Sequence, residues 1–490
     1  MTATAPARAT TLDRWEMVVG LEVHVQLKTR TKIFCRCSAD FGAAPNANTC
    51  PVCLALPGAL PVLNERAVGL ATRAALALNC AVQPVSIFAR KNYFYPDLPK
   101  GYQISQFDKP LATDGSLVIG EKPDGAPIRI GITRVHLEED AGKSIHDRFA
   151  GATAIDLNRA GVPLIEIVSE PDIRSAAEAG SYLRLLKQVL EYVDVSDLNM
   201  EEGSLRVDAN ISIRERGASM LGTKTEVKNM NSFSGVERAL EAEFARQIEI
   251  VEGQGRVEQQ TLLWDADRGT VRPARSKEGS HDYRYFPDPD LPPLRLTKEW
   301  IARIRDGLPE LPDARRRRLA AEHHLPPYDI DVLTANPRIA DYYESVARVH
   351  GDAKIAANWV MGEVLAVLKN TGLTIERFPV RPADLASLLD MIRDRVVSNS
   401  AAKRIFALMA ESGDRPEQIA EREGLTQVGD ESQLATWVDE IIAEHAAEWQ
   451  RYRDGEKKLL GVFVGAVMKK SGGRADPRKV NQLLAARAGA

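Results

Sequence analysis

The sequence predicts an α+β multidomain protein, in which an N-terminal cradle with an antiparallel β-sheet and helices precedes all-α helical and tail domains. Residues 17–28 alternate between apolar and polar side chains, which is the period of a half-buried strand. The same alternation returns in residues 128–138 and 204–214. After about Leu294 the strand patterns end and helical periodicity replaces them. We therefore expect a sheet-containing domain at residues 15–294 and helical domains after it.

The polar positions of these strands carry ionisable side chains. Glu22 and His24 project from the same face because they are two residues apart, and such a pair can bind a metal or transfer a proton. In residues 128–138 the alternation slips near Thr133, which predicts a β-bulge. Further polar residues that share a face are Arg134, His136 and Glu138; Glu166 and Glu170; Arg206, Asp208, Asn210 and Ser212; and Lys224, Glu226 and Lys228. A charged open face suits a charged substrate and a metal, and the alternative is an ordinary solvated sheet face.

Composition and the first residues restrict the class of protein. The chain has 490 residues, enough for about two to four domains, and its 44% hydrophobic and 27% charged content is typical of a globular protein. No apolar run reaches transmembrane length, so we expect no membrane association and a cytoplasmic location. Residues 1–14 are expected to be a disordered tail, because the first dozen lack the hydrophobic segment of a signal peptide. A very short transit peptide is the alternative.

Four of the five cysteines form the pattern C-x-C-x12-C-P-V-C, namely Cys35, Cys37, Cys50 and Cys53. Two close pairs separated by a short loop can supply four thiolates to one tetrahedral Zn²⁺. A structural zinc site is therefore predicted in an insertion at about residues 33–55. Disulfides are not expected in a chain that otherwise has cytosolic features. Cys80 lies in an apolar segment and is expected to be a small buried side chain.

Helix-capping patterns predict three helices in the first domain. In each, a Ser or Asn side chain can accept a hydrogen bond from the first turn of the helix. The cap residues and their helices are Asn64 for residues 65–79, Ser175 with Glu178 for a helix ending near Tyr192, and Ser234 with Glu237 for a helix ending at Gly253.

Two segments of the first domain are predicted to be irregular. Residues 91–106 combine aromatic residues with proline, glycine and lysine, so they are expected to form a loop that either binds a nucleotide or RNA end or is simply packed. The prolines of residues 276–293 exclude continuous regular structure, which places a domain boundary after residue 294.

The remaining chain is predicted to form a helical domain at residues 295–400 and a small tail domain at residues 401–490. The expected helices lie at residues 297–306, 313–323, 341–349, 353–370, 382–396, 401–411 and 433–448, followed by two short ones near the end. The arginines of residues 315–318 are interpreted as a solvated helix face.

The end of the chain is basic, although the whole chain has a net charge of −4. Residues 457–490 hold eight Lys and Arg side chains against one acidic residue, Asp476. Such a surface suits a polyanionic partner, and the alternative is a solvated helix surface. The candidate residues for this contact are Lys457, Lys458, Lys469, Lys470, Arg474, Arg478 and Lys479.

Residues 140–144 read D-A-G-K-S and are similar to the end of a P-loop. The motif fails because Leu137 occupies the position of its first glycine, and no G-x-G-x-x-G occurs in the chain. A nucleotide would therefore bind on the charged sheet face through a metal and side chains, where Lys143 can meet a phosphate.

Several long motifs together identify a family resemblance. They are G-L-E-V-H at Gly20, C-P-V-C-L-A-L-P-G at Cys50, K-N-Y-F-Y-P-D-L-P-K-G-Y-Q-I-S-Q at Lys91, H-L-E-E-D-A-G-K-S at His136, N-R-A-G-V-P-L-I-E-I-V-S-E-P-D at Asn158, E-E-G-S-L-R-V-D-A-N-I-S at Glu201, K-T-E-V-K-N-M-N-S-F at Lys224 and D-Y-R-Y-F-P-D-P-D-L-P-P at Asp282. Over about residues 15–484 the chain resembles the B subunits of the aspartyl/glutamyl-tRNA(Asn/Gln) amidotransferase family.

The resemblance implies a ligase that converts Glu-tRNA(Gln) or Asp-tRNA(Asn) to its amidated form. In this family the B subunit phosphorylates the side-chain carboxylate of the misacylated residue with ATP and Mg²⁺. Ammonia arrives through a channel from an A subunit that hydrolyses glutamine, a C subunit completes the heterotrimer, and the tail contacts tRNA. When the family's site is carried over residue by residue, the resemblance implies that four residues are catalytic and contact Mg²⁺, namely Glu22, His24, Glu138 and Glu226. Nucleotide, phosphate or supporting roles go to Glu139, Lys143, Arg206, Asp208 and Lys228.

Two other classes of protein fit parts of the pattern. An RNA-binding scaffold would need the zinc and the basic tail, but the clustered carboxylates would repel RNA unless they were bound to metal. A metal-dependent hydrolase could use Glu22, His24 and Glu138. Glutamine-dependent amide formation that requires both ATP and aminoacyl-tRNA distinguishes all three classes.

Overall fold

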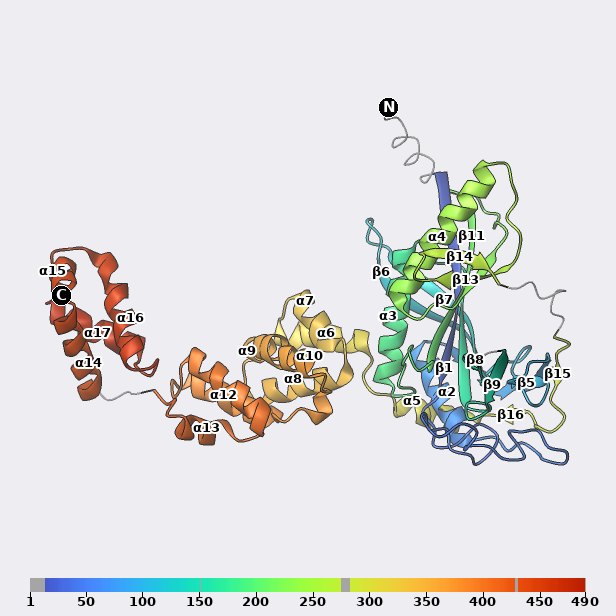
Figure 1. Cartoon of the computed structure of the whole chain (residues 1–490), viewed down its shortest axis with the longest axis horizontal. Coiled ribbons are helices and arrows are strands. Elements are labelled where there is room, and N and C mark those ends of the chain that lie inside the picture. The colour runs from blue at the N-terminus through green and yellow to red at the C-terminus, as the bar shows by residue number, and fades with distance from the viewer. Residues whose placement is uncertain (1–13, 150, 275–282, 428–430, 490) are drawn as a thin grey trace. The chain divides into compact units, whose positions relative to one another are not determined.

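The computed structural model describes residues 14–149, 151–274, 283–427 and 431–489 (Figure 1). It divides into two compact units, Met1–Leu311 and Pro312–Ala490, and every described strand belongs to the first. The tail expected at residues 1–14 lies outside the described residues except for Arg14, whose guanidinium pairs with Glu215 and Glu252.

A nine-stranded sheet forms the centre of the first unit, in the order β14-β13-β12-β11-β1-β10-β7-β6-β2. Neighbouring strands are antiparallel, as predicted, except that β12 and β13 run parallel. The strands are β1 (Trp15–Gln26), β2 (Ala81–Val82), β6 (Ala112–Glu121), β7 (Pro127–Glu139), β10 (Pro163–Ser169), β11 (Leu205–Glu215), β12 (Thr225–Lys228), β13 (Thr261–Asp265) and β14 (Thr270–Pro273).

The central strand β1 shows why the sheet has two different faces. Leu21, Val23 and Val25 are fully buried on one face. Glu22 and His24 lie between them in sequence and are only half-buried on the other face. The period of two thus turns the alternation in the sequence into an apolar face and a charged face.

The bulge predicted near Thr133 is confirmed by the strand register. Val168 of β10 pairs with Arg134 of β7, and Ser169 pairs with Ile132, so Thr133 is an extra residue in β7. The extra residue shifts the phase of the alternation and keeps the ionisable residues that follow it on the charged face.

Three helices pack on the apolar face of the sheet, namely α2 (Glu65–Ala77), α3 (Ala176–Tyr192) and α4 (Phe233–Glu252) (Figure 1). Asn64 and Ser175 cap α2 and α3 as predicted, because their side chains accept hydrogen bonds from the first turns. The cap of α4 is Ser232 rather than Ser234. The chain is already helical one residue later, and the Ser232 hydroxyl accepts from the backbone N–H of Gly235 at 3.0 Å.

Helix α5 (Lys298–Asp306) belongs to the first unit, although its sequence suggested the start of the helical domain. Its Trp300 and Ile301 pack against the core beneath the sheet, and α5 contacts α2. The first unit therefore extends to Leu311, beyond the expected boundary at residue 294.

Smaller sheets border the main one. They are β15 (Phe286–Pro287) with β4 (Ala89–Asn92) and β5 (Tyr102–Ser105), β16 (Leu294–Arg295) with β3 (Val85–Ser86), and the hairpin of β8 (Lys143–Phe149) and β9 (Ala152–Asp156). The segment expected to be a loop at residues 91–106 therefore contains the end of β4 and all of β5, joined by an irregular loop. As expected, Cys80 is buried in the main core.

The second unit is helical. Its helices are α6 (Pro312–His323), α7 (Pro327–Thr334), α8 (Pro337–His350), α9 (Ala353–Trp359), α10 (Leu365–Thr371), α11 (Pro382–Arg393), α12 (Asn399–Ser412), α13 (Pro416–Arg422), α14 (Glu431–Glu444), α15 (Ala446–Arg453), α16 (Leu460–Lys470) and α17 (Pro477–Ala488), with short turns η1 (Val360–Val364), η2 (Ile375–Arg377) and η3 (Lys457–Leu459). One apolar core ends at Leu425 and a second begins at Leu434. Helices α12 and α13 thus pack in the first of these cores, whereas a tail domain was expected from residue 401.

Some helices of this unit differ from the sequence-based expectation for local reasons. Helices α7 and α13 are too short to show periodicity, and the helix expected at 353–370 contains the π-helical turn Val360–Val364. Arg315 is buried against α8, whereas the arginines of 315–318 were expected on a solvated face.

No helix in the described part of the chain is long and apolar enough to cross a bilayer.

Candidate functional site

A row of charged side chains crosses the polar face of the sheet on four neighbouring strands. Arg206 of β11 is paired in register with His24 of β1, His24 with Glu166 of β10, and Glu166 with His136 of β7. Register partners in adjacent strands place their side chains side by side on one face. The strand order therefore brings together residues that are far apart in the sequence.

Three side chains form a first cluster, which we call the first carboxylate group, namely His24, Glu138 and Glu166. Nε2 of His24 lies 3.2 Å from Oε2 of Glu166 and 3.7 Å from Oε1 of Glu138. Nε2 of His136 lies 3.6 Å from the same oxygen of Glu166. The hydroxyl of Ser105 donates to Glu138 at 3.2 Å. One nitrogen or oxygen atom from each member of the group lies within 4.8 Å of the other two, which is a spacing suited to a single metal ion.

The charges of this group are strongly coupled. Burial alone lowers the pKa of His24, but its hydrogen bond with Glu166 and the charges of Glu166 and Glu138 raise the pKa to about 9. Burial raises the pKa of Glu166, but His136 and His24 together lower it well below its usual range. Burial also lowers the pKa of Lys91 on β4, and the carboxylate of Glu138 contributes to a net increase. Cationic side chains thus balance the buried carboxylates.

The second carboxylate group consists of Glu22, Asp208 and Glu226, whose carboxylate oxygens also lie within 4.8 Å of one another. Nζ of Lys228 lies 2.6 Å from Oδ2 of Asp208 and 2.8 Å from Oε1 of Glu226. The side-chain amide of Asn210 donates to Glu22 at 3.0 Å. Burial raises the pKa of Glu22, and the neighbouring carboxylates raise it further. This group therefore has three oxygen donors and one ammonium in direct contact.

The four residues expected to contact Mg²⁺ are divided between the two groups. His24 and Glu138 lie in the first group, whereas Glu22 and Glu226 lie in the second. Asp208, expected in a phosphate or supporting role, belongs to the second group itself.

Glu166 completes the first group, and sequence reasoning did not assign it a role. The alternation in the sequence places Glu166 on a polar face and predicts that Glu170 shares this face. Instead, the carboxylate of Glu170 accepts a hydrogen bond from the hydroxyl of Thr133 at 2.7 Å. Only the register of β10 against β1 reveals that Glu166, not Glu170, lies beside His24.

The other phosphate candidates lie in different environments. Lys143 is exposed at the start of β8, in a hairpin separate from the main sheet. Arg206 donates to Oδ1 of Asp140 at 2.9 Å, and Gln26 donates to Oδ2 at 2.7 Å. Burial raises the pKa of Asp140, but the charges of Arg206 and Arg159 outweigh this and lower it. The guanidinium of Arg206 is therefore held in place at the edge of the charged row.

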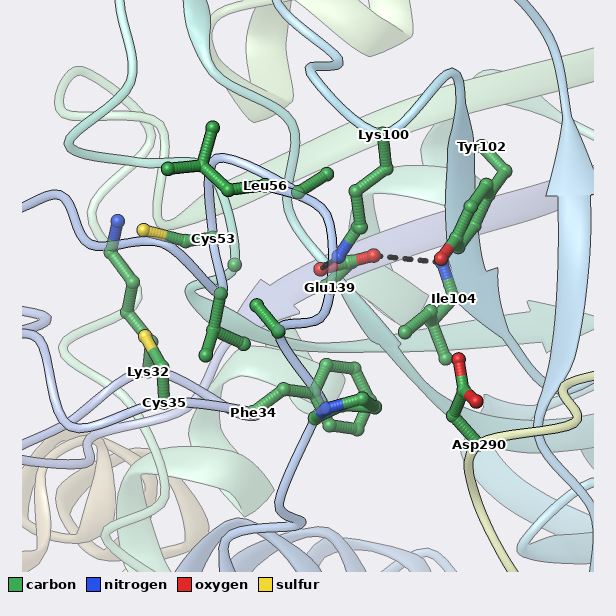
Figure 2. A pocket seen from close by; sticks show the side chains of 15 residues that line it. Lys32, Phe34, Cys35, Cys53, Leu56, Lys100, Tyr102, Ile104, Glu139 and Asp290 are labelled. Atoms are coloured by element: carbon green, nitrogen blue, oxygen red, sulfur yellow. Dashed lines mark hydrogen bonds and ion pairs between the residues drawn. The ribbon is translucent and has the colours of Figure 1, made fainter.

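Glu139 lines a small cavity of about 90 Å³ (Figure 2). Its carboxylate forms an ion pair with Lys100 and accepts from the backbone N–H of Ile104 at 2.9 Å. Cys35 and Cys53 line the same cavity. The cavity thus connects the end of β7 with the cysteine insertion.

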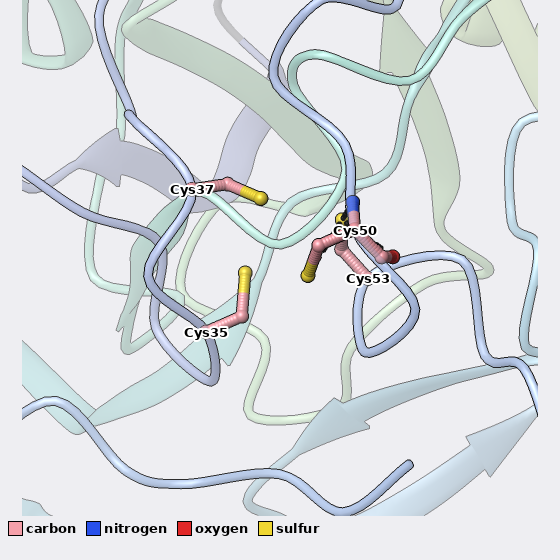
Figure 3. Close-up of side chains that lie close together, drawn as sticks. All are labelled: Cys35, Cys37, Cys50 and Cys53. Carbon is pink, nitrogen blue, oxygen red and sulfur yellow. Dashed lines mark hydrogen bonds between the residues drawn. The ribbon is translucent and has the colours of Figure 1, made fainter.

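The four cysteines of the insertion come together around one point (Figure 3). Their Sγ atoms all lie within 4.8 Å of one another, and those of Cys50 and Cys53 are 3.8 Å apart. A tetrahedral Zn²⁺ with Zn–S bonds of about 2.3 Å requires S···S separations of about 3.8 Å. The hydrogen bond between Cys35 and Cys53 lowers the pKa of Cys53 and raises that of Cys35, as expected for thiols in close contact. The cysteines Cys35, Cys37, Cys50 and Cys53 therefore fit a structural zinc ion.

The cysteine insertion is attached to the loop between β9 and β10. The ammonium of Lys32, which is 1% exposed, donates to the carbonyl oxygens of Asn48 at 2.7 Å and Leu157 at 3.1 Å. The backbone N–H of Asn48 donates to the side chain of Asn158 at 2.8 Å. Gly161 in the same loop donates its N–H to the carbonyl of Asp140 at 2.8 Å. The fold of the insertion is thereby coupled to residues that follow Glu138 in the chain.

The basic residues of the tail are not equally available. Lys457, Lys458, Lys469 and Arg478 are exposed, and Arg474 and Lys479 are half-buried. Lys470 is exposed, but its ammonium lies 2.9 Å from Glu440 and 2.7 Å from Glu444. The positive charge of Lys470 is therefore partly compensated within the tail.

Comparison with known protein families gives two matches. Residues 17–302 match a model described as the GatB/GatE catalytic domain, and residues 341–487 match a model described as the GatB domain. The first match contains both carboxylate groups and the cysteine insertion, and the second contains the tail.

Comparison with curated proteins gives similar full-length relatives. The chain is 53% identical over 470 residues to a protein of Chlorobium chlorochromatii that is named as the B subunit of an aspartyl/glutamyl-tRNA(Asn/Gln) amidotransferase, covering 96% of this chain and 98% of that protein. Proteins with the same name from Trichlorobacter lovleyi and Carboxydothermus hydrogenoformans are each 52% identical over 473 and 476 residues, with 96% of this chain and 98% of each relative covered.

Proposed function

Since the chain belongs to the GatB family of tRNA-dependent amidotransferase B subunits, we propose that it activates the side-chain carboxylate of a misacylated tRNA with ATP. The substrates proposed are Glu-tRNA(Gln), Asp-tRNA(Asn) or both, and the products are the amidated aminoacyl-tRNAs. The observation that carries this proposal is the pair of carboxylate groups on one face of the sheet.

The proposed reaction has two chemical steps. A carboxylate is a poor electrophile, so transfer of a phosphoryl group from ATP to its oxygen gives an acyl phosphate with a good leaving group. Ammonia then attacks the acyl carbon, and inorganic phosphate leaves. The first step brings one anion to another, so it needs cationic groups around the transferring phosphoryl group.

Both carboxylate groups suit Mg²⁺, because this ion prefers oxygen ligands and retains several waters. Mg²⁺ bound there would neutralise charge on the phosphates of ATP. Glu138 and Glu166 would hold one ion in the first group, with His24 as a less usual nitrogen ligand or as a donor to a bound water. Glu22, Asp208 and Glu226 would hold a second ion in the other group.

The chain itself supplies further positive charge and fixed geometry. The ammonium of Lys228 contacts two carboxylates of the second group, so it lies where it would meet a phosphate oxygen of a bound nucleotide. Arg206 stands at one end of the charged row, held by Asp140. The register pairing of four strands keeps these groups in place, which supports transition-state stabilisation without rearrangement.

The proposed cofactors and partners follow from the family. ATP and Mg²⁺ would act at the sheet face, and a Zn²⁺ held by Cys35, Cys37, Cys50 and Cys53 would be structural, because four protein ligands leave no open position. We propose that ammonia comes from a glutamine-hydrolysing A subunit, that a C subunit completes a heterotrimer, and that the basic tail binds tRNA.

The test is amidation by the reconstituted complex with each misacylated tRNA in turn. Glu138→Gln and Glu226→Gln each remove one negative charge with little change in volume. We expect both variants to lose ATP-dependent amidation by about 10²–10³-fold, as loss of a charge-stabilising group does. Glutamine hydrolysis on the partner subunit should fall much less. Glu121→Gln, at the exposed end of β6, is the matched control and should retain activity.

Two results would contradict the proposal. Amidation near the wild-type rate in both variants would place the chemistry elsewhere. Tight tRNA binding without ATP-dependent amidation in the wild-type complex would instead favour an RNA-binding scaffold.

A further inference from the structure

A pair of stacked aromatic rings lies in the first unit outside the two carboxylate groups. The ring centroids of Phe107 and Tyr285 are 4.1 Å apart, and the ring planes differ by 7°. Tyr285 is half-buried, whereas Phe107 remains 47% exposed although Tyr285 covers one side of its ring. The exposed surface of the Phe107 ring is therefore accessible to a flat ligand.

Backbone and side-chain hydrogen bonds hold the stack on both sides. Tyr285 directly precedes β15, which pairs with β4, and the backbone N–H of Asn92 donates to the carbonyl of Tyr283 at 2.9 Å. On the other side, the amide oxygen of buried Gln106, the residue before the exposed ring, accepts from the backbone N–H of Leu137 in β7 at 3.0 Å. The strands β5 and β15 accordingly lie together beside the main sheet (Figure 1).

The stack adjoins the first carboxylate group. Ser105, two residues before Phe107, donates its hydroxyl proton to Glu138 at 3.2 Å. From β4, Lys91 places its ammonium 4.9 Å from the ring centre of Tyr283, which itself packs edge-on against Tyr285. Burial raises the pKa of Tyr285, and the carboxylate of Glu138 adds to the increase, which is consistent with this proximity.

Exposed aromatic rings are concentrated in these segments. The aromatic residues among the exposed large hydrophobics of the described chain are Phe41, Phe94, Tyr95, Phe107, Phe149, Phe286 and Tyr328. Four of them, Phe94, Tyr95, Phe107 and Phe286, belong to β15 or to the segments that flank β5. Flat rings beside cationic side chains are the usual composition of a surface that stacks nucleobases.

We propose that the ring of Phe107, which stacks on Tyr285, is a platform on which an adenine base stacks. The inference rests on the proposed function, because ATP and the 3′ end of a tRNA both carry an adenosine and both must bring a reacting group to the first carboxylate group. Stacking on a neutral ring suits a neutral base next to acidic side chains, where a bare phosphate would be repelled. Lys91, whose ammonium lies 4.9 Å from the ring centre of Tyr283, supplies a positive charge beside these rings.

Photolabelling identifies which adenosine uses the platform and does not require catalysis. The full-length chain, alone and with its partner subunits, is irradiated with 8-azido-ATP in one arm and with a tRNA carrying a 3′-terminal 8-azidoadenosine in the other. We expect label on the peptide that contains Phe107 or on the peptide that contains Tyr285. Label from the first probe assigns the platform to ATP, and label from the second assigns it to the tRNA end. Label on neither peptide with either probe overturns the proposal.

Substitution of the exposed ring gives an independent measurement. Phe107→Leu keeps an apolar side chain but removes the flat ring, and Phe107→Trp enlarges the ring. We expect Phe107→Leu to raise the KM of one substrate, ATP or aminoacyl-tRNA, by about 5- to 150-fold, with kcat changed much less, and Phe107→Trp to restore it. Phe41→Leu, at a ring that is 73% exposed in the cysteine insertion, is the matched control and should leave both KM values unchanged.

The outcomes separate this inference from the proposed function. Unchanged KM values for both substrates in Phe107→Leu, with amidation intact, would overturn the stacking platform and leave the amidotransferase reaction standing. Photolabelling of the platform in a complex that does not amidate tRNA would overturn the proposed function and support adenine binding.

Discussion

Glu166 and His24 face each other across β10 and β1, with a carboxylate oxygen of the glutamate 3.2 Å from Nε2 of the histidine. The same oxygen lies 3.6 Å from Nε2 of His136. Glu166 is thus shared between two imidazoles and is 8% exposed, so its negative charge acts in a largely water-excluded site. Its removal changes both the charge balance and the donor set of the first carboxylate group.

We expect Glu166→Gln to lower ATP-dependent amidation by about 10²–10³-fold, comparable to loss of Glu138. The amide has nearly the same volume, so the fold should be retained and the loss should lie mainly in kcat. The measurement is the initial rate of amidated tRNA formation by the reconstituted complex at saturating glutamine. Thermal unfolding of the variant, near that of the wild type, verifies that the fold is intact.

Glu170→Gln is the matched control for this prediction. Glu170 directly follows β10 in the chain. Its side chain accepts a hydrogen bond from the hydroxyl of Thr133 and is not part of the first carboxylate group. Its substitution should change amidation by less than about threefold. Equal losses in the two variants would mean that the effect of Glu166→Gln is not specific to the site.

The sequence predicts the two faces of the sheet because alternation is a local property. Each residue of β1 faces the core or the solvent according to its position in a period of two, so Glu22 and His24 could be placed on one face. The bulge at Thr133 is similarly visible as a slip in phase. Local hydrogen bonds also made the cap residues Asn64 and Ser175 predictable.

Contacts between distant segments could not be predicted in this way. The position of Glu166 beside His24 depends on strand order and register, which are set by packing over the whole unit. The assignment of α5 to the first unit depends on the packing of Trp300 against the main core. The compensation of Lys470 by Glu440 depends in the same way on how α16 lies against α14.

A second prediction concerns the cysteine insertion. Cys53→Ser should abolish stoichiometric zinc binding, because a hydroxyl does not replace a thiolate ligand, and should lower the thermal stability of the first unit. The attachment of the insertion to the β9–β10 loop through Lys32 and Asn48 should then weaken. Amidation should fall as a consequence. The measurements are elemental analysis of the purified protein and its unfolding temperature.

Cys80→Ala is the control for zinc binding, since Cys80 is buried in the main core, apart from the cysteine insertion. It should retain one zinc ion per chain, whatever its effect on packing. A wild-type protein that contains no zinc, with all four insertion thiols freely titratable and full stability, would contradict the structural role.

A third prediction concerns the buried arginine of the second unit. Arg315 has a side chain 9% exposed, and its guanidinium lies 2.7 Å from carboxylate oxygens of both Asp341 and Glu344 on α8. Arg315→Ala leaves these carboxylates without that partner and removes packed methylene groups, so we expect a loss of about 1–3 kcal/mol in unfolding free energy. Arg317→Ala, at a side chain 76% exposed, should change it by less than about 0.5 kcal/mol. Equal effects in denaturant titrations would contradict burial of Arg315.

The last prediction concerns tRNA binding by the tail. Truncation after Glu456 would be a poor test, because Phe463 and Val480 beyond it are fully buried in the tail core and their loss would unfold the remainder. Substitution of the exposed cations is the better test. We expect the combined variant Lys457→Gln, Lys458→Gln, Lys469→Gln and Arg478→Gln to raise the apparent KM for aminoacyl-tRNA strongly. Glutamine hydrolysis, and ATP hydrolysis without tRNA, should change little.

The salt dependence of binding identifies the mechanism. Each lost phosphate contact should make the slope of log affinity against log salt shallower by roughly 0.7–0.9, so the combined variant should bind tRNA with a clearly weaker dependence. Lys470→Gln is the control, because Glu440 and Glu444 already compensate that ammonium and its loss should change the slope less. Binding titrations at several salt concentrations compare these proteins with the wild type. Identical affinities and slopes in all of them would mean that the basic tail surface does not contact tRNA phosphates.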